Sequence, residues 1–183
     1  MTMTRTLPLL ALLLAGCGAD PILYPVPAVP SGDRIGVSVG SVEVLDVSLP
    51  LYADIEEITF EQVDGSLLTS EEVAWADDPQ RAVTLELARV LGTVTRATVA
   101  PTPWPFESFA EARVDVRVEE FVAGIDGRFR ISGIWYAGTE ERDRSGRFAI
   151  AIPYHPEGGV RAIAIARAQA VRDLARVIAA QGL

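Results

Sequence analysis

Residues 113–137, RVDVRVEEFVAGIDGRFRISGIWYA, contain the pattern that decides the fold. From Val114 to Val118, valine alternates with charged residues, which is typical of a strand with one buried and one solvated face. Phe121 is out of phase with this alternation, so we expect a β-bulge at residues 119–120. The dipeptide Asp126-Gly127 then favours a tight turn into a second strand. The stretch therefore predicts a long antiparallel hairpin.

Shorter strands are expected on both sides of this hairpin. They are recognised by alternating or β-branched apolar residues that are bounded by turn residues, such as Asp64-Gly65. A change of phase at Gly40-Ser41 indicates a bulge in the first of them. The expected strands cover residues 35–44, 55–63, 66–70, 97–100 and 148–154.

Two helices are predicted from apolar residues at helical spacing. For the first, over 79–91, Asp78 can cap the start, Pro79 suits the first position and Gly92 suits the end. The second, over 160–180, has a narrow stripe that small residues dominate. The buried stripes are expected at Val83, Leu87, Val90 and Leu91 in the first helix, and at Ala164, Ala168, Val171, Leu174, Ala175 and Ile178 in the second.

The order of these elements predicts the class α+β. Because neighbouring strands joined by tight turns pair antiparallel, we expect a mainly antiparallel sheet of about five to seven strands. The two helices are expected to pack on one face of that sheet.

The chain begins with a sequence typical of an exported protein. Arg5 precedes an apolar stretch over residues 7–15, which is too short for a membrane span of roughly 20 residues. The end of this stretch resembles the lipobox of bacterial lipoproteins, with Leu14, Ala15, Gly16 and Cys17. The resemblance implies cleavage before Cys17, a diacylglycerol group on its sulfur and an acyl chain such as palmitate on its amine.

This leader divides the chain into a signal peptide over 1–16, a lipidated cysteine with a Pro-rich tether over 17–33, and a domain over 34–183. The tether favours an extended spacer, or residues 22–24 could pair as an edge strand. Acyl chains on Cys17 would hold the protein on a membrane. In the sorting rule of enteric bacteria, an aspartate directly after the lipidated cysteine retains a lipoprotein at the inner membrane. Gly18 stands at that position here, so the outer membrane is favoured, with the protein on its periplasmic face.

Composition excludes several functions. A net charge of −9 opposes nucleic-acid binding, and the chain has no lysine for a phosphate-binding loop or a Schiff base. One cysteine and one histidine make no plausible transition-metal set, so no metal or other cofactor is expected. We find no convincing catalytic set, because His155 is the only base for a serine and most simply lies in an exposed loop. Trp104 and Phe106, in a proline-rich loop, are candidates for partner binding.

The domain also resembles the ABC-type transport auxiliary lipoproteins, a family that includes the outer-membrane lipoprotein of the paraquat-inducible Pqi system. The resemblance covers most of the mature chain, and its landmarks are LPLYA at 49–53, WADDP at 75–79, LARVLG at 87–92, Pro103-Trp104, the strand at 113–121, the strand around Trp135, and AQAVRDLARVIA at 168–179.

This resemblance implies a non-enzymatic accessory of an ABC-type lipid transport system between the inner and outer membranes. Its partner would be a mammalian-cell-entry type protein, and a homo-oligomer is left open. The alternative is a carrier that binds a lipid or small apolar ligand between the sheet and the helices. A periplasmic hydrolase based on His155 is the third hypothesis.

Overall fold

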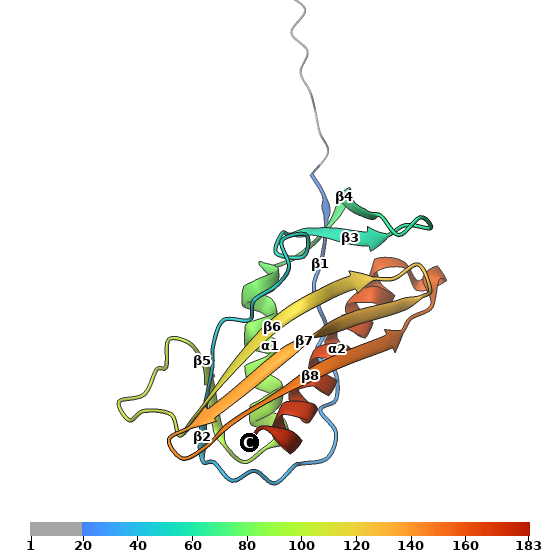
Figure 1. Ribbon diagram of the computed structural model, residues 1–183. Coiled ribbons are helices and arrows are strands. Elements are labelled where there is room, and N and C mark those ends of the chain that lie inside the picture. The colour runs from blue at the N-terminus through green and yellow to red at the C-terminus, as the bar shows by residue number, and fades with distance from the viewer. Residues whose placement is uncertain (1–19) are drawn as a thin grey trace, which may run out of the picture.

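The computed structural model describes residues 20–183, and it has a curved eight-stranded sheet with two long helices behind it (Figure 1). The class α+β is confirmed. A 3-10 turn at Pro156–Gly158 precedes the last helix. In chain order the elements are β1 (Ile22–Tyr24), β2 (Ser41–Val44), β3 (Glu57–Glu61), β4 (Leu67–Trp75), α1 (Pro79–Val94), β5 (Thr98–Pro101), β6 (Ala112–Ala123), β7 (Arg128–Thr139), β8 (Asp143–Pro153) and α2 (Gly159–Gln181).

The hairpin expected from residues 113–137 forms the centre of the sheet as β6 and β7. Its register shifts between Val118 and Glu120, where a bulge is expected, and the shift returns Phe121 to the buried face. Gly127 has a φ of +71°, a conformation that glycine adopts without strain, and it closes the turn. β8 continues the antiparallel pairing along the free edge of β7.

The sheet is mixed, so the expectation of a mainly antiparallel sheet of five to seven strands is wrong in both respects. β2 and β3 both pair parallel with β6, and β2 also pairs parallel with β5. The chain between β2 and β5 includes α1, and parallel strands require a crossover of this kind. Only strands joined by tight turns, such as β3 with β4, pair antiparallel with their successor.

Several element boundaries differ from the sequence expectations. β4 runs on to Trp75 instead of ending at residue 70, and β8 begins at Asp143 instead of residue 148. Two further differences concern residues 35–40 and the end of α1. Residues 35–40 form no strand, although their alternating apolar side chains pack against the core, because the N–H groups of Ile35 and Ser38 donate to the carbonyls of Val94 and Leu183 near the ends of the helices and not to a neighbouring strand. Helix α1 continues past Gly92, which is exposed on its surface. The helix ends at Thr95, whose hydroxyl and backbone N–H both donate to the carbonyl of Leu91.

The core lies between the concave face of the sheet and the two helices. Both predicted helix stripes are buried, and on the sheet side the central strands provide apolar residues at alternate positions. The fully or nearly fully buried sheet residues include Val42, Val44, Val114, Val116, Val118, Phe129, Ile131 and Trp135.

The N-terminal part of the described chain lies along the domain (Figure 1). β1 pairs parallel with the end of β4, so of the two alternatives for residues 22–24 the edge strand is observed. Further along, Arg176 donates from Nη1 to the carbonyls of Ser31 at 3.0 Å and Asp33 at 2.8 Å. Neither helix within residues 20–183 combines the length and apolarity that a membrane crossing requires.

Candidate functional site

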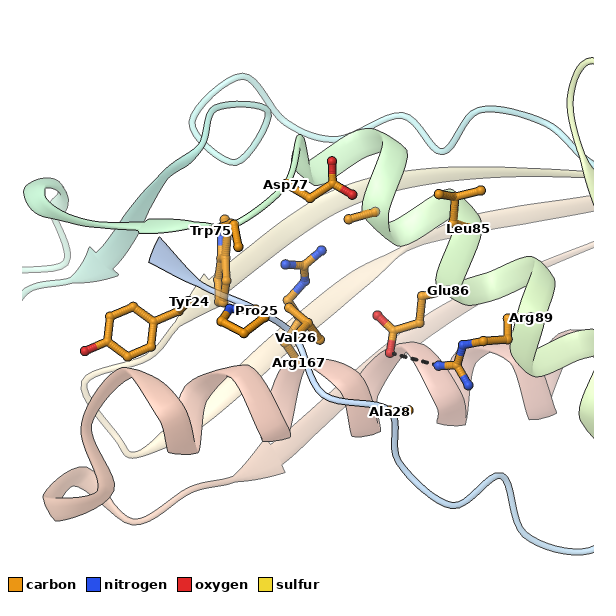
Figure 2. A pocket seen from close by; sticks show the side chains of 12 residues that line it. Tyr24, Pro25, Val26, Ala28, Trp75, Asp77, Leu85, Glu86, Arg89 and Arg167 are labelled. Atoms are coloured by element: carbon orange, nitrogen blue, oxygen red, sulfur yellow. Dashed lines mark ion pairs between the residues drawn. The ribbon is translucent and has the colours of Figure 1, made fainter. Parts of the chain in front are cut away.

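The candidate site is a pocket of about 380 Å³ where β1, the end of β4, α1 and α2 meet (Figure 2). We call it the Arg167 pocket. Its walls are mostly apolar, and its charged groups come from both helices and from the turn before α1. The lining residues are Tyr24, Pro25, Val26, Ala28, Trp75, Ala76, Asp77, Ala82, Leu85, Glu86, Arg89 and Arg167.

Backbone pairing fixes the strand side of the pocket. Trp75 is the last residue of β4, and its N–H donates to the carbonyl of Glu56 at 2.7 Å. Tyr24 lies beside Trp75 in the register of β1 and β4, and its carbonyl accepts the N–H of Ala76 at 3.0 Å. The indole of Trp75 is therefore buried, with only 5% of the residue exposed, beneath the chain that leaves β1.

Helix α2 provides the central charge of the pocket. Arg167 lies one helical turn from both Ile163 and Val171, so it belongs to the buried face of the helix and is 0% exposed. Figure 2 shows its side chain rising from α2 toward Trp75 and Asp77. The guanidinium carbon lies 4.6 Å from the centroid of the Trp75 ring and 5.4 Å from that of Phe121. Both distances suit cation–π contacts.

The guanidinium of Arg167 has no hydrogen-bond partner within residues 20–183. Its Nε, Nη1 and Nη2 atoms are all buried and unpaired. Burial lowers the pKa of Arg167 to about 10, and the nearby Glu86 and Asp77 partly offset this by raising it. The guanidinium therefore stays charged at neutral pH. An unpaired buried donor costs about 1–3 kcal/mol, and more when the group is charged.

Glu86 brings a second ionisable group to the pocket from α1. Burial raises the pKa of Glu86 to about 7, while Arg167 and Arg89 lower it by smaller amounts. Its Oε1 accepts no hydrogen bond from the part of the chain that the structure describes, and it lies 3.9 Å from Nη2 of Arg89 (Figure 2). The pocket thus combines a permanent cation with a carboxyl group that gains or loses a proton near neutral pH.

The loop after β5 contains the aromatic residues that the sequence analysis selects for partner binding. Trp104 and Phe106 pack edge to face, with ring centroids 4.9 Å apart. The indole N–H of Trp104 donates to the carbonyl of Ser108 at 2.6 Å, which ties the loop to itself. Phe106 is 51% exposed, and Phe109 nearby is 87% exposed. These residues form a surface separate from the Arg167 pocket, and we call Phe106 and Phe109 the aromatic loop pair.

The remaining sequence-selected residues lie apart from the pocket. The lipobox and the lipidation site, Leu14 to Cys17, fall outside the described residues. His155 is exposed beside the turn before α2. Glu119 and Glu120 form separate ion pairs, with Arg147 at 2.7 Å and Arg130 at 2.8 Å, and the bulge between Val118 and Glu120 leaves both on the solvent face of the sheet.

Sequence reasoning missed Arg167 and Glu86. A signal for Arg167 was present, because it interrupts an otherwise apolar stripe of α2, four residues after Ile163 and four before Val171. Glu86 likewise interrupts the apolar stripe of α1, three residues after Val83 and four before Val90, and it is buried. A charge at a core position of a helix is rare without a partner, so each was a candidate for a site.

A curved mixed sheet backed by two helices defines a small α+β domain that is also found in solved structures. The structure is similar to a crystal structure of an uncharacterized protein, with a TM-score of 0.72 and 18% identity over 88% of this chain and 97% of that one. It is also similar to a Xanthomonas campestris protein of the family DUF330, with a TM-score of 0.65 and 15% identity over 85% and 91% of the two chains. These likenesses concern the fold. No curated protein matches the sequence.

The sequence model of one family covers most of the chain. The ABC-type transport auxiliary lipoprotein component family matches residues 23–179. The chain belongs to this family, which confirms the resemblance found in the sequence. The protein is thus an auxiliary component of the ABC-transport type, and a lipoprotein by family.

Proposed function

We propose that this protein is a non-catalytic docking component of a lipid transport system of the ABC and mammalian-cell-entry type, anchored through Cys17 to the outer membrane and facing the periplasm. The observation that carries the proposal is the family match over residues 23–179, which makes the chain an auxiliary part of a transporter. Such a part acts by holding another component in place.

The position of the aromatic loop pair supports docking. Figure 1 shows the loop between β5 and β6 far from the start of β1, and β1 is the described element nearest to Cys17 in the sequence. An anchor at one end and exposed aromatic rings at the other would present those rings to a partner in the periplasm. Exposed aromatic residues are frequent anchors of protein interfaces.

The packing of the interior favours docking over the carrier alternative. The space between sheet and helices is occupied by a continuous cluster of buried side chains. A pocket beside Ile58 and Phe129 within this region has a volume of only about 10 Å³, too small for an acyl chain. A ligand would therefore have to bind at the surface.

Co-purification with a mammalian-cell-entry type protein from the same organism tests the proposal. Phe106→Ser with Phe109→Ser is the test variant, and Val63→Ser is the control, because Val63 is a 91% exposed apolar residue in the β3–β4 turn. Each buried aromatic anchor contributes about 2 kcal/mol or more, so the double variant should lose the partner after washing while the control keeps it. Equal recovery of the mammalian-cell-entry type protein with the wild type, the double variant and the control would refute docking through this loop. Failure of the wild type to recover that protein would refute the proposed class of partner.

A further inference from the structure

The Arg167 pocket contains a buried guanidinium that Glu86 and Asp77 attract but to which neither forms a hydrogen bond. All three guanidinium nitrogens lack a hydrogen-bond partner within the described chain, although Arg167 is 0% exposed. The cation–π contacts with Trp75 and Phe121 attract the charge, but they occupy the face of the guanidinium plane and leave its N–H groups free. Buried polar groups in folded proteins are nearly always paired, so these N–H groups are available to a hydrogen-bond acceptor from outside the chain.

The geometry of the free donors limits the chemistry of that ligand. A guanidinium presents five N–H groups in a planar fork, and this fork matches the paired oxygens of a carboxylate or phosphate. The pocket that Arg167 lines has about 380 Å³ of room, enough for such a group together with several carbon atoms, and the buried guanidinium must turn into this space to contact a ligand. Leu85 at the rim is 40% exposed, and Val26 and the Trp75 ring line the pocket beside it. These apolar surfaces would contact a hydrocarbon stem.

The place of the pocket in the chain indicates where such a ligand would come from. Tyr24, in the pocket wall, lies seven residues after Cys17. Seven residues span at most about 25 Å when fully extended. If Cys17 is lipidated, the pocket lies within that distance of a membrane surface, where anionic groups on apolar stems are abundant.

We propose that the Arg167 pocket binds an anionic membrane amphiphile, with its phosphate or carboxylate on the guanidinium of Arg167 and its stem against Trp75, Val26 and Leu85. The site is independent of the aromatic loop pair and of any transport partner. It assigns to the domain a lipid-headgroup site in the pocket where β1, the end of β4, α1 and α2 meet, distinct from a carrier cavity between sheet and helices.

Binding of an anion would be coupled to a proton. The charged or ionisable groups around Arg167 are Glu86 and Arg89 on α1, Asp77 in the turn before it and Tyr24 on β1. An anion beside Glu86 disfavours its carboxylate, so Glu86 takes up a proton from solvent when the ligand binds. Because Glu86 already has a pKa of about 7, affinity should be higher at pH 6 than at pH 8.

The test uses the mature lipidated protein in dodecyl maltoside micelles, without any partner protein. Dihexanoyl phosphatidylglycerol is the probe, because its phosphate diester keeps one charge between pH 6 and 8. Inorganic phosphate lacks the stem, and hexanol lacks the charge. The readout is the NMR signal of the Trp75 indole N–H, assigned with Trp75→Phe. We expect the probe to shift the Trp75 signal in a saturable way, and hexanol to leave the signal unchanged. Inorganic phosphate should bind at least about tenfold more weakly than the probe.

Arg167→Met removes the charge and retains an apolar side chain, and Arg161→Met makes the same change at an exposed position of α2. We expect Arg167→Met to weaken probe binding at least about tenfold and Arg161→Met to leave it unchanged. Glu86→Gln keeps Arg167 in place, and it should abolish the difference between pH 6 and pH 8. This second variant provides a test even if Arg167→Met does not fold.

Several results would overturn the inference. They are the absence of a saturable Trp75 shift, equal affinity for inorganic phosphate and the probe, or unchanged binding by Arg167→Met. A binding constant that does not vary with pH in the wild type would overturn the proton coupling. The Phe106→Ser/Phe109→Ser protein should bind the probe normally, so a failure here and a failure of docking can be told apart.

Discussion

Glu86 should make the stability of the protein depend on pH in the direction opposite to an ordinary paired carboxylate. Burial raises its pKa from the usual 4.5 to about 7 in the folded protein. The folded state therefore holds the proton more tightly than the unfolded state, and the free energy of unfolding falls as pH rises from about 4.5 to about 7. Across that window the loss attributable to Glu86 is about 3 kcal/mol.

Glu86→Gln isolates this contribution, because glutamine has nearly the same shape and does not ionise. Urea unfolding between pH 5 and pH 8, followed by circular dichroism, gives the free energy of unfolding of each protein. We expect wild type and Glu86→Gln to differ little at pH 5, and the variant to be more stable by about 2–3 kcal/mol at pH 8.

The control is Glu71→Gln, which makes the same change at an exposed position of β4. Its stability should follow that of the wild type at every pH. If Glu86→Gln also follows the wild type in parallel, or is less stable at pH 8, then Glu86 is ionised in the folded protein with little cost, and the account of the pocket is wrong.

Three further predictions concern the framework around the site. A methyl group on Gly146 would lie 2.6 Å from Cζ2 of Trp135, so Gly146→Ala should lower the free energy of unfolding by about 1–3 kcal/mol, whereas Gly36→Ala, with no atom within 4 Å, should change it little in the same urea assay. Arg130 pairs with three carboxylates from β3, β6 and the β6–β7 turn, so Arg130→Met should destabilise by about 1–3 kcal/mol in low salt and by less in 1 M NaCl. The carboxylate of Asp78 accepts the N–H of Arg81 at 2.7 Å, so Asp78→Ala should cost about 1 kcal/mol and leave the native circular dichroism spectrum unchanged.

Local features of the fold could be predicted from the sequence because they depend on nearby residues. The bulge before Phe121, the turn at Asp126-Gly127, the Asp78 cap and the buried stripes of both helices are all observed. The parallel pairing of β2 and β3 with β6 could not be predicted, because strand direction depends on contacts between distant segments.

The site shows the same limit. Arg167 and Glu86 come from different helices and are brought together only by the packing of α1 on α2. Their sequence neighbours are typical core residues, so the charge at each position was visible in the sequence but its surroundings were not. The apolar wall from Tyr24 to Ala28 was hidden for another reason: four prolines in ten residues favour a spacer, whereas the folded chain lies against the domain.

The claim on which the proposed docking role depends is that acyl chains fix this domain to a membrane. Mass spectrometry of the protein purified from a membrane fraction tests it directly. We expect an N-terminal peptide that begins at Cys17, with a diacylglycerol thioether on the sulfur and a third acyl chain on the amine. A peptide in which Cys17 is an unmodified thiol, with the mature protein in the soluble periplasmic fraction, would contradict the account.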